Sequence, residues 1–228
     1  MSKRPVSNPL ALAVLSCLWE RPMYPYEMTT TLRERGKEDS IRLNFGSLYA
    51  VIKSLEKHGL IKAARTEREG NHPERIVYDI TDAGKTEAID WLRELIALPL
   101  REYPAFEAGL SLLAMLEPAE ATTLLRDRLA RLDTDLAERE QMLTAPQTQR
   151  VPELFLIEGS FRVAMLEAER AFVALLADRL DRGELGGYEM WVRMHELLAA
   201  GSTRAELATE LATYLAGYPG EEAEDPNN

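Results

Sequence analysis

One predicted helix, residues 44–58, presents hydroxyl and ammonium groups on the side opposite its apolar stripe. Its apolar residues have the i, i+3, i+4, i+7 spacing of a buried helix face: Leu48, Val51, Ile52 and Leu55. The outward positions are small, hydroxylated or basic: Ser47, Tyr49, Ala50, Lys53, Ser54 and Lys57. Small residues let a helix backbone approach base edges, hydroxyls bond to phosphates or bases, and lysines neutralise phosphates. This face is therefore suited to binding a polyanion.

Further candidates for the same chemistry flank the helix. Arg42 precedes it, and the first helical residues, Asn44 to Ser47, can offer backbone N–H groups to a phosphate. The tip of a predicted hairpin holds three basic side chains: Arg68, His72 and Arg75. A narrow basic finger of this kind fits a minor groove or flanking phosphates, although neighbouring glutamates dilute its charge. For Tyr49, Arg68 and Arg75 taken singly, packing and solvation at the surface are an equally good explanation.

The elements that would position these residues follow the order helix, helix, helix, hairpin, helix. Ser7-Asn8-Pro9 is a typical helix start, and a second helix is expected from Pro25 to the stop at Gly36. Two short segments with β-branched residues, 60–66 and 75–81, predict the hairpin. Three short helices and a two-stranded hairpin describe a winged helix-turn-helix, whose third helix can enter a major groove about 12 Å wide.

The rest of the chain shows only helical periodicity. Helices are predicted at about 105–116, 118–143, 151–182, 188–199 and 203–216. The fold class is therefore mainly α, a winged helix-turn-helix domain with a small β-hairpin wing followed by an all-helical dimerisation domain. We expect these domains: 1–98 for DNA binding, 99–185 for dimerisation, 186–218 for additional helices and 219–228 for a disordered acidic tail.

Charge is distributed unevenly along the chain. The net charge of -11 argues at first sight against a nucleic-acid partner. However, residues 1–85 contain 14 basic and 11 acidic side chains, whereas residues 86–228 contain 13 basic and 27 acidic ones. The asymmetry favours one segment that approaches polyphosphate and another that faces solvent or a protein partner.

Several other classes of protein are disfavoured by the sequence. A single cysteine, Cys17, and three scattered histidines argue against a metal site, and no cofactor is expected. No catalytic residues are predicted, because no nucleophile, base and orienting group occur at a suitable spacing. The chain has no apolar run long enough for a membrane helix and no signal peptide, so we expect a soluble cytoplasmic protein without membrane contact.

Several motifs occur in one order over about 90 residues, and together they resemble the PadR family of bacterial transcriptional regulators. The motifs are Leu10 to Leu18, Tyr24-Pro25-Tyr26-Glu27-Met28, Gly46-Ser47-Leu48-Tyr49, Leu55-Glu56-Lys57-His58-Gly59-Leu60-Ile61 and Pro73 to Gly84. The resemblance implies a homodimer that uses paired winged helices on a palindromic operator, usually for repression. It also implies that Ser47, Tyr49 and Lys53 lie against DNA and that the hairpin tip is the wing. Pro25 stands where the family commonly has a small residue.

The carboxyl-terminal helices supply the expected dimer interface. The predicted helix 151–182 has more apolar surface than one short neighbouring helix could cover, so dimer burial is a reasonable explanation. An apolar or aromatic effector could also lie between these helices, against Trp91, Phe106, Phe161 and Met165. Packing is the favoured interpretation, because Met and Phe at helical spacing fill cores routinely. Residues 187–216 extend beyond the usual family length.

The sequence therefore predicts a dimeric, sequence-specific DNA-binding regulator, a repressor that an effector releases. The alternative is a winged-helix module that binds proteins instead of DNA, which the overall acidity permits. The two hypotheses differ in whether binding to DNA is present and falls steeply with salt.

Overall fold

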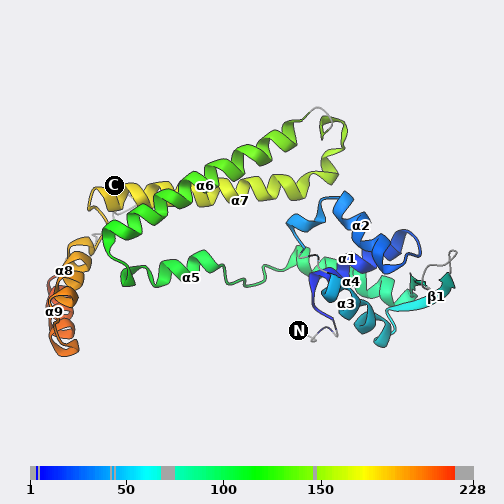
Figure 1. Cartoon of the computed structure of the whole chain (residues 1–228), viewed down its shortest axis with the longest axis horizontal. Helices are drawn as coiled ribbons and strands as arrows, with labels where there is room; N and C mark the ends of the chain where they lie inside the picture. Colours follow the sequence, from blue (N-terminus) through cyan, green and yellow to red (C-terminus); the bar gives the residue numbers. More distant parts are fainter. Residues whose placement is uncertain are drawn as a thin grey trace, which may run out of the picture. The chain divides into compact units, whose positions relative to one another are not determined.

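The computed structural model of the chain describes residues 4, 6–41, 43, 45–67, 75–145 and 148–218. It divides into two compact units, Met1–Glu102 and Tyr103–Asn228. The described residues are mainly helical, with a two-stranded antiparallel sheet in the amino-terminal unit (Figure 1). The predicted fold class is thus confirmed, while the finer division of the carboxyl-terminal half into domains stays a prediction.

The amino-terminal unit begins with three helices. These are α1 (Pro9–Glu20), α2 (Pro25–Glu34) and α3 (Phe45–Lys57), with the 3-10 turn η1 (Lys37–Asp39) between the last two. The predicted start of α1 is confirmed, because Asn8 Oδ1 accepts the N–H of Leu10 at 3.0 Å. Gly36 ends α2 with φ +65°, a left-handed conformation that glycine adopts at no steric cost.

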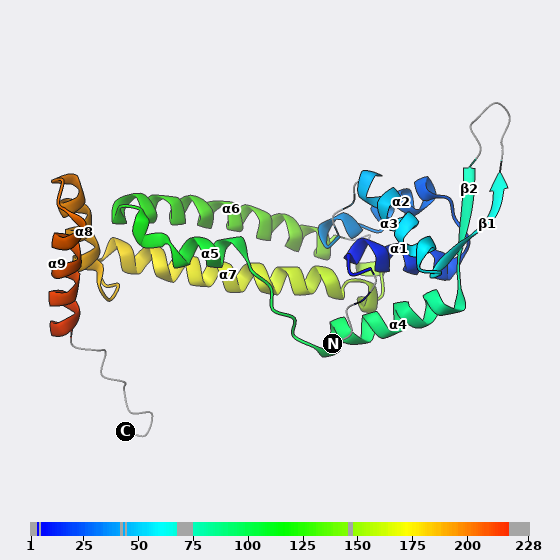
Figure 2. The same ribbon diagram turned by 90° about the horizontal axis from the view of Figure 1, so that it is seen from below.

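The hairpin consists of β1 (Ile61–Glu67) and β2 (Arg75–Ile80), close to the predicted segments. The paired residues are Ile61 with Ile80, Lys62 with Asp79, Ala63 with Tyr78, Arg65 with Val77, Thr66 with Ile76 and Glu67 with Arg75. The register shifts between Ala63 and Arg65, where a bulge adds one residue to β1. Figure 2 shows the two strands side by side beyond the helices of this unit.

Two contacts fasten the base of the hairpin to the neighbouring helices. Met23, just before α2, exchanges two backbone hydrogen bonds of 3.1 and 2.9 Å with Tyr78 of β2. Thr81 follows β2, and its Oγ1 accepts the N–H of Gly84 at 3.0 Å, which caps α4 (Asp82–Ala97). Both contacts therefore join β2 and the residue after it to the helical part of the unit.

One apolar cluster lies between these elements. The largest of its fully buried side chains are Leu10, Leu15, Leu18, Met23, Met28, Ile52, Leu55 and Ile61. Cys17 belongs to the same cluster, and burial raises the pKa of its thiol to about 11. The thiol is therefore protonated and unreactive near neutral pH, and its role is packing.

The carboxyl-terminal unit is helical throughout its described residues. Its elements are α5 (Ala105–Ser111), η2 (Leu113–Met115), α6 (Pro118–Thr144), η3 (Thr148–Arg150), η4 (Glu153–Phe155), α7 (Ile157–Asp181), α8 (Tyr188–Ala199) and α9 (Arg204–Gly217). In Figures 1 and 2, α6 and α7 run side by side as a long pair. Among the described residues, no helix combines the length and the apolar character that crossing a membrane requires.

Two predicted boundaries in this unit were wrong. The helix predicted over 151–182 begins only at Ile157, because residues 148–150 and 153–155 form two tighter 3-10 turns before it. The helix predicted over 105–116 is divided after Ser111 into α5 and the tighter turn η2. Both differences leave the predicted order of helices unchanged.

α6 and α7 are held together by a narrow apolar core and by ion pairs on either side of it. The buried residues of this core are Leu125, Leu132, Leu166, Val173, Ala177 and Leu180. The ion pairs join Arg126 to Asp178 and Asp181, Arg128 to Glu169, and Arg170 to Asp133. Because these charges are substantially exposed, each pair stabilises the unit only slightly, and the apolar core between α6 and α7 provides most of the attraction.

Gly84→Ala is expected to destabilise the amino-terminal unit. A Cβ at this position would lie 2.0 Å from the carbonyl oxygen of Leu60 and 2.9 Å from Ile80 Cγ1, so the backbone would have to move. We expect the free energy of unfolding to fall by about 1–3 kcal/mol in urea denaturation followed by circular dichroism. Gly109→Ala is the control, because its Cβ would meet nothing within 4 Å. Equal stability of the two variants would contradict the close approach.

Candidate nucleic-acid interface

The third helix is oriented by its buried side. Leu48, Ile52 and Leu55 are 3%, 1% and 0% exposed and belong to the core of the amino-terminal unit, as does Val51. The predicted apolar stripe is therefore confirmed. Because a helix repeats every 3.6 residues, burying this stripe determines which residues lie on the opposite side.

The opposite side of α3 presents Tyr49, Lys53 and Lys57. All three are exposed, Tyr49 to 52%, and they follow one another at intervals of four residues. Their side chains therefore form one row along the helix, with a phenol and two ammonium groups. Glu56 is also exposed at the edge of this row. Such a row can donate hydrogen bonds and neutralise two phosphates along a nucleic-acid groove.

The other residues predicted near α3 are placed differently. Ser47 is half-buried and makes an interaction of its own, so it does not belong to the exposed row. Arg42 and Asn44 lie outside the described residues. The structure thus brings together Tyr49, Lys53 and Lys57 from the predicted set around this helix.

The hairpin supplies one described residue of the predicted set. Arg75, the first residue of β2, is exposed, and its guanidinium carbon lies 5.2 Å from the centre of the Tyr24 ring. A cation over an aromatic face is attracted by the ring quadrupole, which orients this side chain. Arg68 and His72 lie outside the described residues. β1 adds exposed basic side chains at Lys62 and Arg65, which the sequence analysis did not select.

A pocket rich in tyrosine lies beside α3, and the sequence analysis missed it. It has a volume of about 470 Å³ and is lined by Tyr24, Pro25, Tyr26, Tyr49, Arg75, Ile76 and Tyr78. Burial, assisted by Glu56 and Tyr49, raises the pKa of Tyr78, so this phenol stays protonated. The available signal was the repeated tyrosine around Pro25, but its proximity to β2 depends on the bridge between Met23 and Tyr78.

The predicted effector residues do not form one group within a unit. Trp91 of α4 is 5% exposed and belongs to the amino-terminal core, where the guanidinium carbon of Arg4 lies 5.6 Å from its ring centre. Phe106 of α5 lines a pocket of about 530 Å³ in the carboxyl-terminal unit. Phe161 and Met165 are 66% and 55% exposed on α7. An effector role for these four residues stays a prediction.

Comparisons with known proteins find relatives of this chain, above all for its amino-terminal unit. Residues 14–89, which include the second half of α1, all of α2 and α3, and the hairpin, match the transcriptional regulator PadR-like family. The chain thus contains a PadR-like domain. The Negative transcriptional regulator PadR of Bacillus subtilis (strain 168) is 28% identical over 130 residues, which are 57% of this chain and 70% of that protein. The family consists of transcriptional regulators, in agreement with the expectation that the chain is not an enzyme.

Solved PadR structures share the fold. Bacillus subtilis PadR in complex with operator DNA has a TM-score of 0.57 at 22% identity, and the match covers 76% of this chain and 99% of that chain. The same regulator in complex with p-coumaric acid has a TM-score of 0.56 at 19% identity, and the match covers 75% of this chain and 98% of that chain. The matches cover nearly all of the solved chains but only about three quarters of this one. This PadR-like chain therefore contains residues beyond the shared fold.

Removing the positive charges of the α3 row is expected to leave the fold intact. Lys53 and Lys57 are exposed, so Lys53→Gln and Lys57→Gln should each change the free energy of unfolding by no more than about 0.5 kcal/mol. Leu48→Ala on the buried side should cost about 2–5 kcal/mol. Urea denaturation of the three variants measures the difference. Lysine variants as unstable as Leu48→Ala would mean that this row is structural.

Proposed function

We propose that this PadR-like regulator is a transcriptional repressor that binds a palindromic operator as a homodimer. The observation that carries the proposal is the row of Tyr49, Lys53 and Lys57 on the exposed side of a helix whose other side is fully buried. In a winged helix-turn-helix, this helix reads the major groove and the hairpin reaches the adjoining backbone or minor groove. Repression agrees with the description of the Bacillus subtilis relative as a negative regulator.

DNA contact is assigned to two groups of residues. On α3, Lys53 and Lys57 neutralise phosphates and Tyr49 donates a hydrogen bond from its phenol. On the hairpin, Arg75 contacts the backbone from its position over Tyr24. We assign the remaining predicted contacts, Arg42, Asn44, Ser47, Arg68 and His72, to the same interface. Phosphate contacts supply affinity and register, while groups on α3 that reach base edges supply sequence preference.

Homodimerisation is supported by an exposed apolar seam on α7. The residues of the seam are Phe161, Met165, Ala168, Phe172 and Leu175, all of them exposed. Their spacing alternates between four and three residues, which is the repeat by which two helices pack in a coiled coil. The opposite side of α7 holds Leu166, Val173 and Ala177, which are buried against α6. A second copy of the chain is the occupant that we assign to the seam.

Release by a small molecule completes the proposed function. A Bacillus subtilis PadR structure contains p-coumaric acid and another contains operator DNA, so that relative binds both kinds of partner. A ligand changes operator affinity only if it binds more tightly to one of the DNA-bound and DNA-free states. We propose the same linkage for this chain.

Binding to DNA should be steeply salt-dependent, and Lys53→Gln should lower the slope. Fluorescence anisotropy with the DNA upstream of the chain's own gene, at several salt concentrations, measures both. Each lost lysine–phosphate contact should reduce the slope of log K against log salt by about 1. Lys85→Gln is the charge-matched control, because Lys85 lies on α4 and pairs with Asp82. No binding to DNA, together with capture of a protein partner, would favour the protein-interaction alternative.

Leu175→Asp should shift the chain from dimer to monomer. The substitution places a charge in the apolar seam, which a dimer would have to desolvate. Sedimentation velocity at several protein concentrations measures the change. Leu215→Asp on α9 is the matched control, because Leu215 and Leu175 are 61% and 59% exposed. A dimer that survives Leu175→Asp but not Leu215→Asp would assign the interface to α9.

A further inference from the structure

The pocket between α5, η2 and α6 has the dimensions and lining of a small-molecule site. Its volume of about 530 Å³ falls within the usual range for ligand pockets, roughly 300–1,000 Å³. Its apolar lining consists of Phe106, Gly109, Leu110, Leu113, Leu116, Ala121, Leu124, Leu125 and Leu132. The charged side chains at the same pocket are Asp127, Arg128, Arg131 and Asp135. The pocket thus combines a large apolar surface with a few charged groups.

One wall of the pocket is held in place by α8. Trp191 donates from Nε1 to the carbonyl oxygen of Leu116 at 2.8 Å, and His195 Nε2 lies 3.0 Å from the carbonyl oxygen of Ala114. Both carbonyls belong to η2 or to the residue that follows it, so α8 fixes the turn that carries Leu113 and Leu116. The wall is therefore supported from behind by side-chain hydrogen bonds.

Two of the four charged groups already have partners. The guanidinium of Arg128 bonds to Glu169 of α7, and its carbon lies 3.8 Å from the centre of the Phe106 ring. Asp135 accepts a hydrogen bond of 2.8 Å from Arg139. These pairs satisfy one cation and one anion at the edge of the pocket. The charge available to a ligand must therefore come from Asp127 or Arg131.

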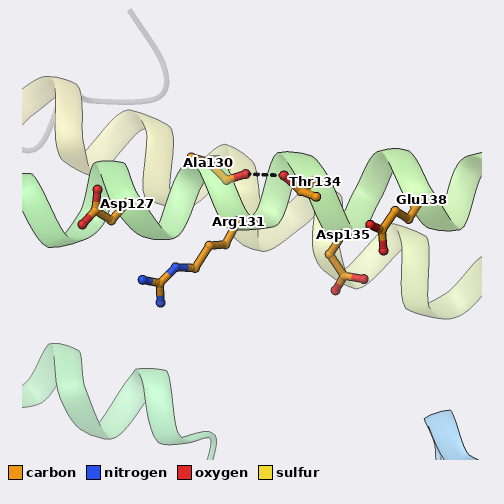
Figure 3. A pocket seen from close by; sticks show the side chains of 6 residues that line it. All are labelled: Asp127, Ala130, Arg131, Thr134, Asp135 and Glu138. Carbon is orange, nitrogen blue, oxygen red and sulfur yellow. Dashed lines mark hydrogen bonds between the residues drawn. The ribbon is translucent and has the colours of Figure 1, made fainter.

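Arg131 is the better placed of the two for a ligand. Figure 3 shows a second hollow along α6, lined by Asp127, Ala130, Arg131, Thr134, Asp135 and Glu138, so that Arg131 lies at both. In that view the Arg131 side chain extends away from α6, and the Asp127 carboxylate leaves the helix in another direction. Within the described part of the chain, the structure shows no ion pair or hydrogen bond for the Arg131 guanidinium. A guanidinium at the edge of an apolar pocket is suited to a carboxylate, because it can donate two parallel hydrogen bonds.

We propose that this pocket binds a small apolar anion, with an aromatic or branched body among the leucines and its anionic group on Arg131. The proposal rests on the proposed function, since it names the site and the ligand class for an effector-released regulator. A second copy of the chain fits the α7 seam better than this pocket. The seam has a regular helical repeat, whereas the pocket is concave and presents a cation.

A pair of fluorescent probes tests the charge requirement. Anilinonaphthalene sulfonate is an apolar anion, and N-phenylnaphthylamine has the same rings without the charge. Arg131→Gln should weaken binding of the anionic probe about tenfold or more, because it removes a charge-assisted hydrogen bond, and should leave the neutral probe unchanged. Arg204→Gln, an exposed change on α9, is the control. Equal weakening of both probes, or of neither, would overturn the role of Arg131.

Filling the pocket tests its location. Gly109 lies in α5 and lines the pocket, and a Cβ there meets nothing within 4 Å, so Gly109→Leu should project into the space without breaking the fold. The higher helix propensity of leucine also favours α5. We expect Gly109→Leu to weaken both probes at least tenfold relative to Gly109→Ala, which removes the glycine but leaves room. Wild-type affinity in Gly109→Leu would place the probes elsewhere and overturn the proposal.

The same variants separate this proposal from the proposed function. Gly109→Leu and Arg131→Gln should bind operator DNA as the wild type does in the absence of probe, because neither residue belongs to the α3 row. If DNA binding is absent in every variant while probe binding follows the pattern above, the pocket stands and the regulatory function fails. If operator binding is intact and probe binding ignores both substitutions, the pocket proposal fails alone.

Discussion

Burial of one side of α3 decides which groups of the amino-terminal unit are available to DNA. Leu48, Ile52 and Leu55 lie in the core, and burying each such side chain contributes about 1.5–3 kcal/mol. Turning the helix over would expose these residues and would place the ammonium groups of Lys53 and Lys57 in an apolar environment, at a further cost. The exposed basic row is thus a consequence of the hydrophobic core, and its position is as firmly determined as the core itself.

The hairpin is tied to the same core by contacts between residues distant in the sequence. The bridge between Met23 and Tyr78 brings β2 to the start of α2, and Gly84 approaches the backbone of Leu60 too closely for any larger residue. These contacts leave the relative positions of α2, α3 and β2 little freedom. A nucleic-acid surface made of several elements requires such rigidity, because each element must meet a phosphate or base at a defined spacing.

Local signals explain which features could be predicted from the sequence. Asn8 and Thr81 are caps that act within three residues of themselves, and the stripe of α3 follows from helical periodicity alone. The tyrosine pocket could not be predicted, because Tyr24 and Arg75 meet only through strand pairing. The burial of Trp91, which the sequence analysis placed with Phe106 at an effector site, also depends on distant residues. Spacing along the chain cannot reveal that Arg4 and the amino-terminal core cover Trp91. The late start of α7 could not be predicted from periodicity, because a 3-10 turn such as Glu153–Phe155 continues the helical spacing of apolar residues over so short a stretch.

The carboxyl-terminal unit separates two tasks on the two sides of α7. One side packs on α6 and makes the unit stable, while the other repeats apolar residues at the spacing suited to a second helix. A ligand bound beside α6 can influence such an assembly only through elements that have more than one arrangement. The short turn η2 and Leu116 after it fit this requirement, because they carry two leucines of the pocket and are held to α8 by side-chain hydrogen bonds from Trp191 and His195. Because both hydrogen bonds come from α8, this helix contributes to the energy needed to move that turn.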